Sequence, residues 1–344
     1  MKAAVVTDIG KLEVLDVPMP KVGEYDVLCE LVYGSTCAGT DIHLMDGQHP
    51  TRHIPFPTIL GHESVGRVVE TGSKVKNYSI GDLVTRVGCP ALPDAGIYSS
   101  WGGFARYGIA RDHWQMRRDG VARDQWMSYR VNQIVHPSIS EKEAPMIITW
   151  RETLSYDRRI GISPGTQLLL IGSGANALAH CAHACNLGAL VTVVGSARQE
   201  ETFRKLSICA YHDYKAENLA EIIREERHGA AFDMILDGVG AAGTVNALLP
   251  QLKDGGTLGI YGWNGRKQYA LNPFNAAHSF RLYSNGYDEE ETNGEVQAAV
   301  LCGKLNASMW YDMTAPVALD DIASAYDSLR RHDALKYLIS LKGE

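Results

Sequence analysis

The stretch LLLIGSGANALAHC, from Leu168 to Cys181, decides the fold of this chain of 344 residues. An apolar run ends at a glycine-rich turn, and a helix-like segment of small and apolar residues follows it. The turn has the form G-x-G-x-x-A, in which Gly172 permits a tight turn, Gly174 lets a pyrophosphate approach the backbone, and Ala177 permits close helix packing. The amides at the helix N-terminus would then face the phosphates. Between a strand and a helix, this motif predicts a dinucleotide-binding unit.

The sequence around this motif predicts an α/β fold in three parts. From about residue 153 to 286, short apolar runs alternate with helix-like stretches, which indicates a parallel sheet covered by helices. Residues 1–152 contain short β-branched runs separated by Gly, Pro and Asp, which favours a β-rich domain. A capping box of Ser140 and Glu143 predicts the start of a helix near the end of that domain. The tail predicts one amphipathic helix and a last strand.

Composition and charge exclude several classes of protein. The chain is 45% hydrophobic and 21% charged, with a net charge of -7, which argues against a nucleic-acid or anionic-membrane surface. It has no secretory leader pattern and no uninterrupted apolar run of about 18 residues. Its seven scattered cysteines do not form a disulfide framework and suit a reducing cytoplasm. We therefore expect a cytoplasmic protein without nucleic-acid or membrane partners.

The end of the next strand indicates which dinucleotide binds. NAD sites place an acidic residue about 20 residues after the glycines, to bind the ribose 2′-hydroxyl. Here Gly195 and Ser196 occupy that place and Arg198 follows. Without the carboxylate a 2′-phosphate is not repelled, and Arg198 could pair with it. NADP is therefore expected in preference to NAD. Alternatively, Arg198 is solvated helix surface and NAD still binds.

A second constellation has the residue types of a catalytic zinc site. The segment STCAGTDIHLMDG contains Cys37, and 25 residues later His62 follows in GHESVGRVVETG. Glu152 lies at the end of the first part of the chain. A cysteine, a histidine and a carboxylate would supply three ligands and leave a fourth position open for water or substrate. One cysteine alone is more often a small buried residue, so the prediction depends on the combination.

These motifs together resemble the zinc-dependent medium-chain dehydrogenases/reductases, closest to their polyol (sorbitol-type) and threonine-type members. The likeness includes GTDIH after Cys37, GHE with Gly66, GDLV, GGFARY, the glycine turn, and the strand ends DGVG and YGW. The resemblance implies a GroES-like β-rich catalytic domain over residues 1–152 and a doubly wound Rossmann domain over residues 153–286. It also implies that residues 287–344 return to the catalytic domain.

The resemblance also assigns roles to single residues. It implies zinc ligation by Cys37, His62 and Glu152, and it places Thr40 and His43 in a proton relay. Glu63 would bind or approach the metal, and Asp41 would orient the His62 imidazole. The cofactor contacts that it implies are Gly172, Gly174, Ala175, Asn176, Ser196, Arg198, Val239, Tyr261 and Lys336.

The sequence departs from the family pattern in three places. Two residues separate Cys37 from Thr40 where the family usually has one, so either a small bulge follows Cys37 or Thr40 lies away from the relay position. Only Cys89 is present where a structural zinc lobe needs four cysteines, which predicts one catalytic zinc and no structural zinc. The segment 113–131 is longer than usual and could be a substrate lid, a subunit contact or plain surface packing.

The expected reaction is hydride transfer between a secondary alcohol and NADP(H) or NAD(H), giving the ketone. The resemblance favours a polyol, sugar, cyclitol or amino alcohol as substrate, with a simple alkyl alcohol as runner-up. Two alternatives stay open: a zinc-free quinone or enone reductase, and a catalytically silent NADPH-binding protein. The resemblance also implies a homodimer or homotetramer, formed at a sheet edge near residues 280–286.

Overall fold

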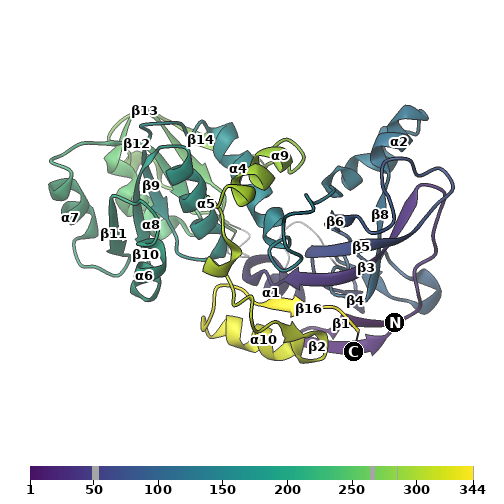
Figure 1. Cartoon of the computed structure of the whole chain (residues 1–344). Helices are drawn as coiled ribbons and strands as arrows, with labels where there is room; N and C mark the ends of the chain where they lie inside the picture. The colour runs from purple at the N-terminus through teal and green to yellow at the C-terminus, as the bar shows by residue number, and fades with distance from the viewer. Residues whose placement is uncertain (49–53, 264–267, 285, 344) are drawn as a thin grey trace. The chain divides into compact units, whose positions relative to one another are not determined.

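The computed structural model describes residues 1–48, 54–263, 268–284 and 286–343, which form two compact units (Figure 1). The first unit contains Met1–Arg151 and Glu289–Glu344, and the second contains Glu152–Asp288. The chain therefore leaves the first unit after Arg151 and re-enters it at Glu289. None of the described helices is both long enough and apolar enough to cross a membrane.

The first unit is rich in β-structure. Its strands are β1 (Lys2–Asp8), β2 (Lys11–Asp16), β3 (Asp26–Ser35), β4 (Thr58–Ile59), β5 (Glu63–Thr71), β6 (Leu83–Thr85), β7 (Tyr98–Ser99), β8 (Tyr107–Arg111), β15 (Val317–Ala318) and β16 (Leu338–Ser340). Its helices are α1 (Ala38–Met45), α2 (His113–Arg118), α3 (Arg123–Trp126), α9 (Asn293–Leu301) and α10 (Ile322–Arg330). The first turns of α4 (Met146–Ile160) belong to this unit, and the rest of α4 belongs to the second.

The long strand β3 organises the first unit. It pairs antiparallel with β5 on one side and with β16 on the other, and alternate apolar side chains of these strands enter the core. The register places Ser35, at the end of β3, opposite both Glu63 and Leu338. Three strands that are far apart in the sequence therefore meet at one end of the sheet.

The second unit is a parallel sheet with helices lying beside its strands (Figure 1). Its strands are β9 (Gln167–Ile171), β10 (Leu190–Gly195), β11 (Ala210–Asp213), β12 (Phe232–Asp237), β13 (Leu252–Ile260) and β14 (Phe280–Tyr283). Its helices are α5 (Ala175–Asn186), α6 (Glu200–Phe203), α7 (Leu219–Glu226) and α8 (Ala242–Leu248). The strand order across the sheet is β11-β10-β9-β12-β13-β14. The chain moves outward from β9 to β11 on one side and then from β12 to β14 on the other, so the topological switch point lies between the parallel neighbours β9 and β12. In such sheets, ligands bind at the carboxyl ends of the strands beside this switch point.

Local structure differs from the sequence prediction at three places. The Ser140 hydroxyl does accept a hydrogen bond from the Glu143 amide (3.2 Å), but the chain makes turns until α4 begins at Met146. Helix α1 begins directly after Cys37, so the extra residue is absorbed by a helical turn rather than a bulge. The tail contains α9 in addition to the expected helix α10 and strand β16.

Candidate metal centre and nucleotide site

The ends of β3 and β5 bring three potential metal ligands together. Cys37 lies two residues beyond the end of β3, and His62 and Glu63 lie at the start of β5. The ligand atoms of these three buried residues all lie within 4.8 Å of one another, and His62 Nε2 is 3.8 Å from Glu63 Oε1. A thiol, an imidazole and a carboxylate are the donor types that bind zinc, so this cluster fits the metal.

Asp41 holds both of the sequence-predicted ligands of this unit. Its Oδ1 atom is 3.1 Å from His62 Nδ1, and its Oδ2 atom accepts a hydrogen bond from the Cys37 amide at 2.9 Å. The hydroxyl of Tyr326, on α10, donates to the same Oδ2 at 2.5 Å. Such a contact fixes the imidazole tautomer and leaves Nε2 to face the cluster, as expected for Asp41.

The electrostatic environment of His62 favours a cation in the cluster. Burial alone would lower the pKa of His62, but the Asp41 carboxylate and the Cys37 side chain together outweigh burial and raise it well above 6.5. A metal ion must therefore displace a proton from this imidazole, and its binding weakens as the pH falls.

A buried lysine pairs with Glu63. Lys336 Nζ lies 2.5 Å from Glu63 Oε2 and also donates to the Thr36 carbonyl at 3.1 Å. Burial alone would lower the pKa of Lys336, but the adjacent Glu63 carboxylate raises it above its ordinary 10.5, so the Lys336 ammonium keeps its charge at neutral pH. The Ser35 hydroxyl also bonds to Oε2, and the Thr149 hydroxyl donates to Oε1 at 2.9 Å. Glu63 therefore faces His62 only through Oε1.

The other predicted site residues of the catalytic half lie on two helices. Thr40 and His43 are on α1, three residues apart, so they share one face of that helix. Glu152 is buried on α4, one turn after Thr149, and it is the first residue of the second unit. The structure thus groups Cys37 and His62 with Glu63, while ligation by Glu152 and the relay role of Thr40 and His43 stay predictions.

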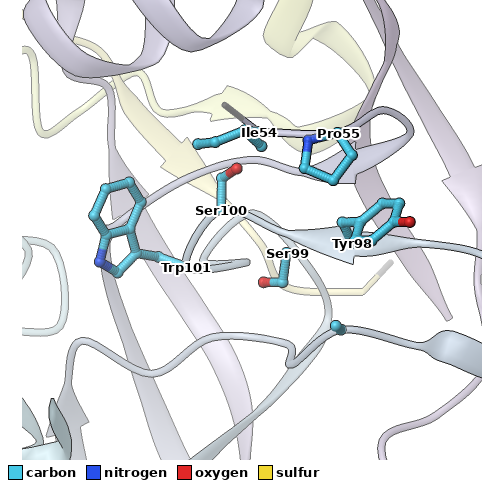
Figure 2. Close-up of a pocket in the computed structure, with 7 residues that line it drawn as sticks. Ile54, Pro55, Tyr98, Ser99, Ser100 and Trp101 are labelled. Carbon is cyan, nitrogen blue, oxygen red and sulfur yellow. The ribbon is translucent and has the colours of Figure 1, made fainter. Parts of the chain in front are cut away.

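A pocket of about 490 Å³ opens beside this cluster (Figure 2). Its lining residues are Ile54, Pro55, Ala91, Tyr98, Ser99, Ser100 and Trp101. Figure 2 shows Ile54 and Pro55 across from the segment Tyr98–Trp101. The Trp101 ring is tilted against the His62 ring at 5.4 Å between centroids, and Trp101 has a left-handed φ of 66°. A bulky residue in that region is a backbone outlier, and such outliers cluster at functional sites.

The predicted glycine turn lies at the switch point of the second sheet. Gly172 follows β9 with a φ of 128°, and a Cβ there would lie 3.1 Å from Val239 Cγ2. A Cβ on Gly174 would meet nothing within 4 Å, so this glycine borders open space at the N-terminus of α5. Ala175 and Asn176 form the first turn of that helix. The turn therefore has the close packing and the open backbone that a pyrophosphate requires.

The remaining predicted cofactor residues of this unit follow neighbouring strands. The Ser196 amide, after β10, donates to Ser173 Oγ of the glycine turn at 2.9 Å, and Arg198 is exposed two residues later. The Val239 amide donates to Asp237 Oδ1 at the end of β12 at 2.8 Å. Tyr261 follows β13 and packs edge-on against His180 at 4.3 Å. All of these strand ends lie on the carboxyl side of the sheet.

Several residues that hold the cluster escaped sequence reasoning. The sequence motifs do not indicate Tyr326, Ser35 or Thr149. Lys336 is predicted to contact the cofactor, which stays a prediction, and the structure shows in addition that it bonds to Glu63. No local pattern marks these contacts, because they depend on the pairing of β16, β3 and β5. Trp101, which directly precedes the GGFARY motif, is the residue from which the pocket could have been predicted.

Two protein-family models match most of the chain. Residues 23–119 match the family described as alcohol dehydrogenase GroES-like domain, and residues 171–300 match the family described as zinc-binding dehydrogenase.

Curated relatives span nearly the same length. The chain is 25% identical to D-xylulose reductase A of Aspergillus niger, over 98% of this chain and 95% of the relative. It is 24% identical to sorbitol dehydrogenase of Bacillus subtilis, over 82% and 81% of the two chains. It is 26% identical to L-threonine 3-dehydrogenase of Shewanella frigidimarina, over 73% and 74%.

Solved structures share the fold at lower identity. A protein of Sinorhizobium meliloti 1021, described as a zinc-binding dehydrogenase and solved with NADP, superimposes with a TM-score of 0.81 at 21% identity, over 98% of both chains. Benzyl alcohol dehydrogenase of Acinetobacter calcoaceticus gives a TM-score of 0.80 at 17% identity, over 99% of both chains.

Proposed function

The chain belongs to the zinc-type medium-chain dehydrogenases/reductases and is an alcohol-type oxidoreductase, and on this premise we propose that it interconverts a polyol-like secondary alcohol and its ketone with one catalytic zinc and NADP(H). The observation that carries the proposal is the buried cluster of Cys37, His62 and Glu63 beside a pocket of small-molecule size.

In this proposal Cys37, His62 and one carboxylate hold the metal. The carboxylate is either Glu152, as the sequence predicts, or Glu63, whose Oε1 atom is 3.8 Å from His62 Nε2. Zinc in such a site supplies a Lewis acid that lowers the pKa of a bound alcohol. Asp41 orients the imidazole and the Cys37 backbone, so both ligands are fixed before the metal binds.

The proton released by the alcohol would leave through side chains of α1. Thr40 supplies a hydroxyl that can accept and pass a proton, and His43 supplies an imidazole that can take up and release one. Their spacing of three residues puts both groups on the same helix face, which supports a relay in that order.

The pocket beside Trp101 supports a polyhydroxylated substrate. Its volume of about 490 Å³ suits a compound of several carbons, and the hydroxyl-bearing residues Tyr98, Ser99 and Ser100 are among those that line it. The Ser99 hydroxyl donates to the Cys89 carbonyl at 2.6 Å and can still accept a hydrogen bond. The Trp101 ring adds an apolar surface next to His62. A sugar, polyol, cyclitol or amino alcohol presents the same combination of C–H and hydroxyl groups.

The choice of NADP over NAD depends on Arg198. Replacing Arg198 by alanine should lower kcat/KM with NADPH about 10- to 100-fold, because a charge-assisted bond to the 2′-phosphate contributes about 1.5–3 kcal/mol, and should leave the value with NADH nearly unchanged. Arg204→Ala is the matched control, since the Arg204 guanidinium already bonds to Glu200 Oε1 at 2.7 Å. A wild-type protein with a much higher kcat/KM for NADH would contradict the preference.

Metal analysis combined with a nicotinamide absorbance assay tests the whole proposal. We expect about one equivalent of zinc per chain and NADPH formation that depends on a secondary alcohol, with polyols, cyclitols and sugars screened against NADP and NAD. Enone reduction by a zinc-free protein would select the quinone-reductase alternative. Cofactor binding without turnover on any alcohol would select a silent NADPH-binding protein.

A further inference from the structure

Arg86, directly after β6, has a backbone conformation that arginine seldom adopts. Its φ is 58°, in the left-handed region, although it is not a glycine and its side chain is only 7% exposed. A residue held there costs about 1–3 kcal/mol and persists only where its surroundings enforce it. Its side-chain contacts show what enforces it.

The Arg86 guanidinium connects the metal-ligand loop to Glu289. Its Nη1 atom donates to the His62 carbonyl at 3.0 Å, and its Nη2 and Nε atoms donate to Glu289 Oε1 at 2.7 and 3.1 Å. The other carboxylate oxygen of Glu289 accepts a hydrogen bond from Arg151 Nη2 at 2.9 Å. Both arginines and the carboxylate are almost fully buried, so the three charges form one desolvated triad.

The triad stands where the chain passes between the two units. Arg151 is the last residue of the first unit before the chain leaves it, and Glu289 is the first residue after the chain returns. The Arg151–Glu289 ion pair therefore joins the points at which the chain leaves and re-enters the first unit. The neighbouring Glu290 pairs instead with Arg130, from the long 113–131 segment.

The structure assigns Glu289 as a positioning residue: acting through Arg86 on the His62 carbonyl, it sets the orientation of a metal ligand from the crossover of the chain. Asp41 fixes the His62 ring at Nδ1, and Arg86 fixes the peptide that carries the ring. Two contacts at opposite ends of the residue determine where Nε2 points. The inference rests on the proposed function, since it takes His62 to hold a metal.

Cobalt(II) substituted into the full-length protein gives a direct readout, because its visible absorption bands report ligand geometry. Glu289→Gln keeps the side-chain shape and removes the charge, and we expect it to shift the cobalt bands. We also expect it to lower kcat/KM for the alcohol about 10- to 100-fold with little change in the KM for NADPH, since small misplacements at a reacting centre cost that much. Glu289→Asp, which restores the charge, should recover part of both losses.

Glu290→Gln is the matched control, since it removes a carboxylate from the same segment and should leave the cobalt bands as in the wild type. Unchanged bands and kcat/KM in Glu289→Gln, or an equal shift in Glu290→Gln, would overturn the inference alone. A wild-type protein without a Cys37-dependent cobalt band would overturn both the inference and the proposed function. If Glu289→Gln does not fold, Arg86→Lys replaces it, because lysine keeps the charge but loses the donor fork of arginine. The same shift of the cobalt absorption bands is then expected in Arg86→Lys.

Discussion

Replacement of Cys37 by alanine is expected to empty the metal centre and lower alcohol turnover about 10³-fold, while NADPH still binds. Cys37 supplies the sulfur ligand of the cluster, and the remaining imidazole and carboxylate are too few to hold zinc tightly. Loss of several kcal/mol of transition-state stabilisation corresponds to that factor. The glycine turn that we expect to bind the cofactor belongs to the other unit and is not altered. Metal analysis, steady-state kinetics and a nicotinamide fluorescence titration measure the three quantities separately.

Cys89→Ala is the matched control for this substitution. Cys89 is a buried cysteine of the same unit, but it packs among apolar side chains and is not a member of the cluster. The Cys89→Ala protein should keep its zinc and its alcohol turnover. A zinc-free Cys37→Ala protein with wild-type activity would refute the zinc mechanism. The same metal analysis identifies the carboxylate ligand: Glu152→Gln should lose zinc if Glu152 binds it, and full zinc content would point to Glu63.

Replacement of Lys336 by methionine is expected to lower the free energy of unfolding of the metal-free protein by about 3–5 kcal/mol. Methionine preserves most of the side-chain volume but removes the ammonium group that pairs with Glu63. A buried charge left without its partner costs about that much. The side chains of Lys336 and Glu63 are 0% and 2% exposed, so solvent cannot replace the lost partner. Urea denaturation of chelator-treated protein measures the difference without a contribution from the metal.

The pH dependence of this difference has a definite sign. The pKa of Lys336 in the folded protein is raised above 10.5. The contribution of Lys336 to the free energy of unfolding is therefore fully present below pH 10.5 and is lost as the pH rises through its folded-state pKa. Lys342→Met is the control, because Lys342 pairs with Glu141 at the surface with 45% of its side chain exposed, and such pairs contribute at most about 1 kcal/mol. Equal effects of the two substitutions would show that burial of Lys336 has no energetic role.

The nucleotide half of the fold could be predicted because its information is local. The residues from Leu168 to Cys181 carry the strand, the turn and the helix in one continuous stretch, and the parallel sheet follows from the alternation around it. The presence of Arg198 after β10 was equally visible. Helix α9 was missed because its buried positions, which include Gln297, do not give a clear apolar stripe, whereas α10, of the same length, has one.

The catalytic half could be predicted only in part. Cys37 and His62 were found from residue type and motif, and the structure places them together with Glu63. The partners of Glu63 were not found, since Lys336 lies 273 residues away in sequence and Thr149 lies 86 away. Their proximity arises from strand pairing, and a sequence pattern does not specify which strands pair. Arg86 was missed because a left-handed backbone leaves no mark when the residue is not a glycine.

The contacts of the C-terminal segment with the cluster also determine when the proposed metal centre can be completed during synthesis. Cys37, His62 and Asp41 leave the ribosome early, but Tyr326 and Lys336 emerge only after the whole second unit has been made. Until then the Asp41 carboxylate lacks its Tyr326 hydrogen bond and Glu63 lacks its positive partner. The second unit can therefore fold first on the nascent chain, and the cluster proposed to hold the metal is completed only after the C-terminal segment has emerged.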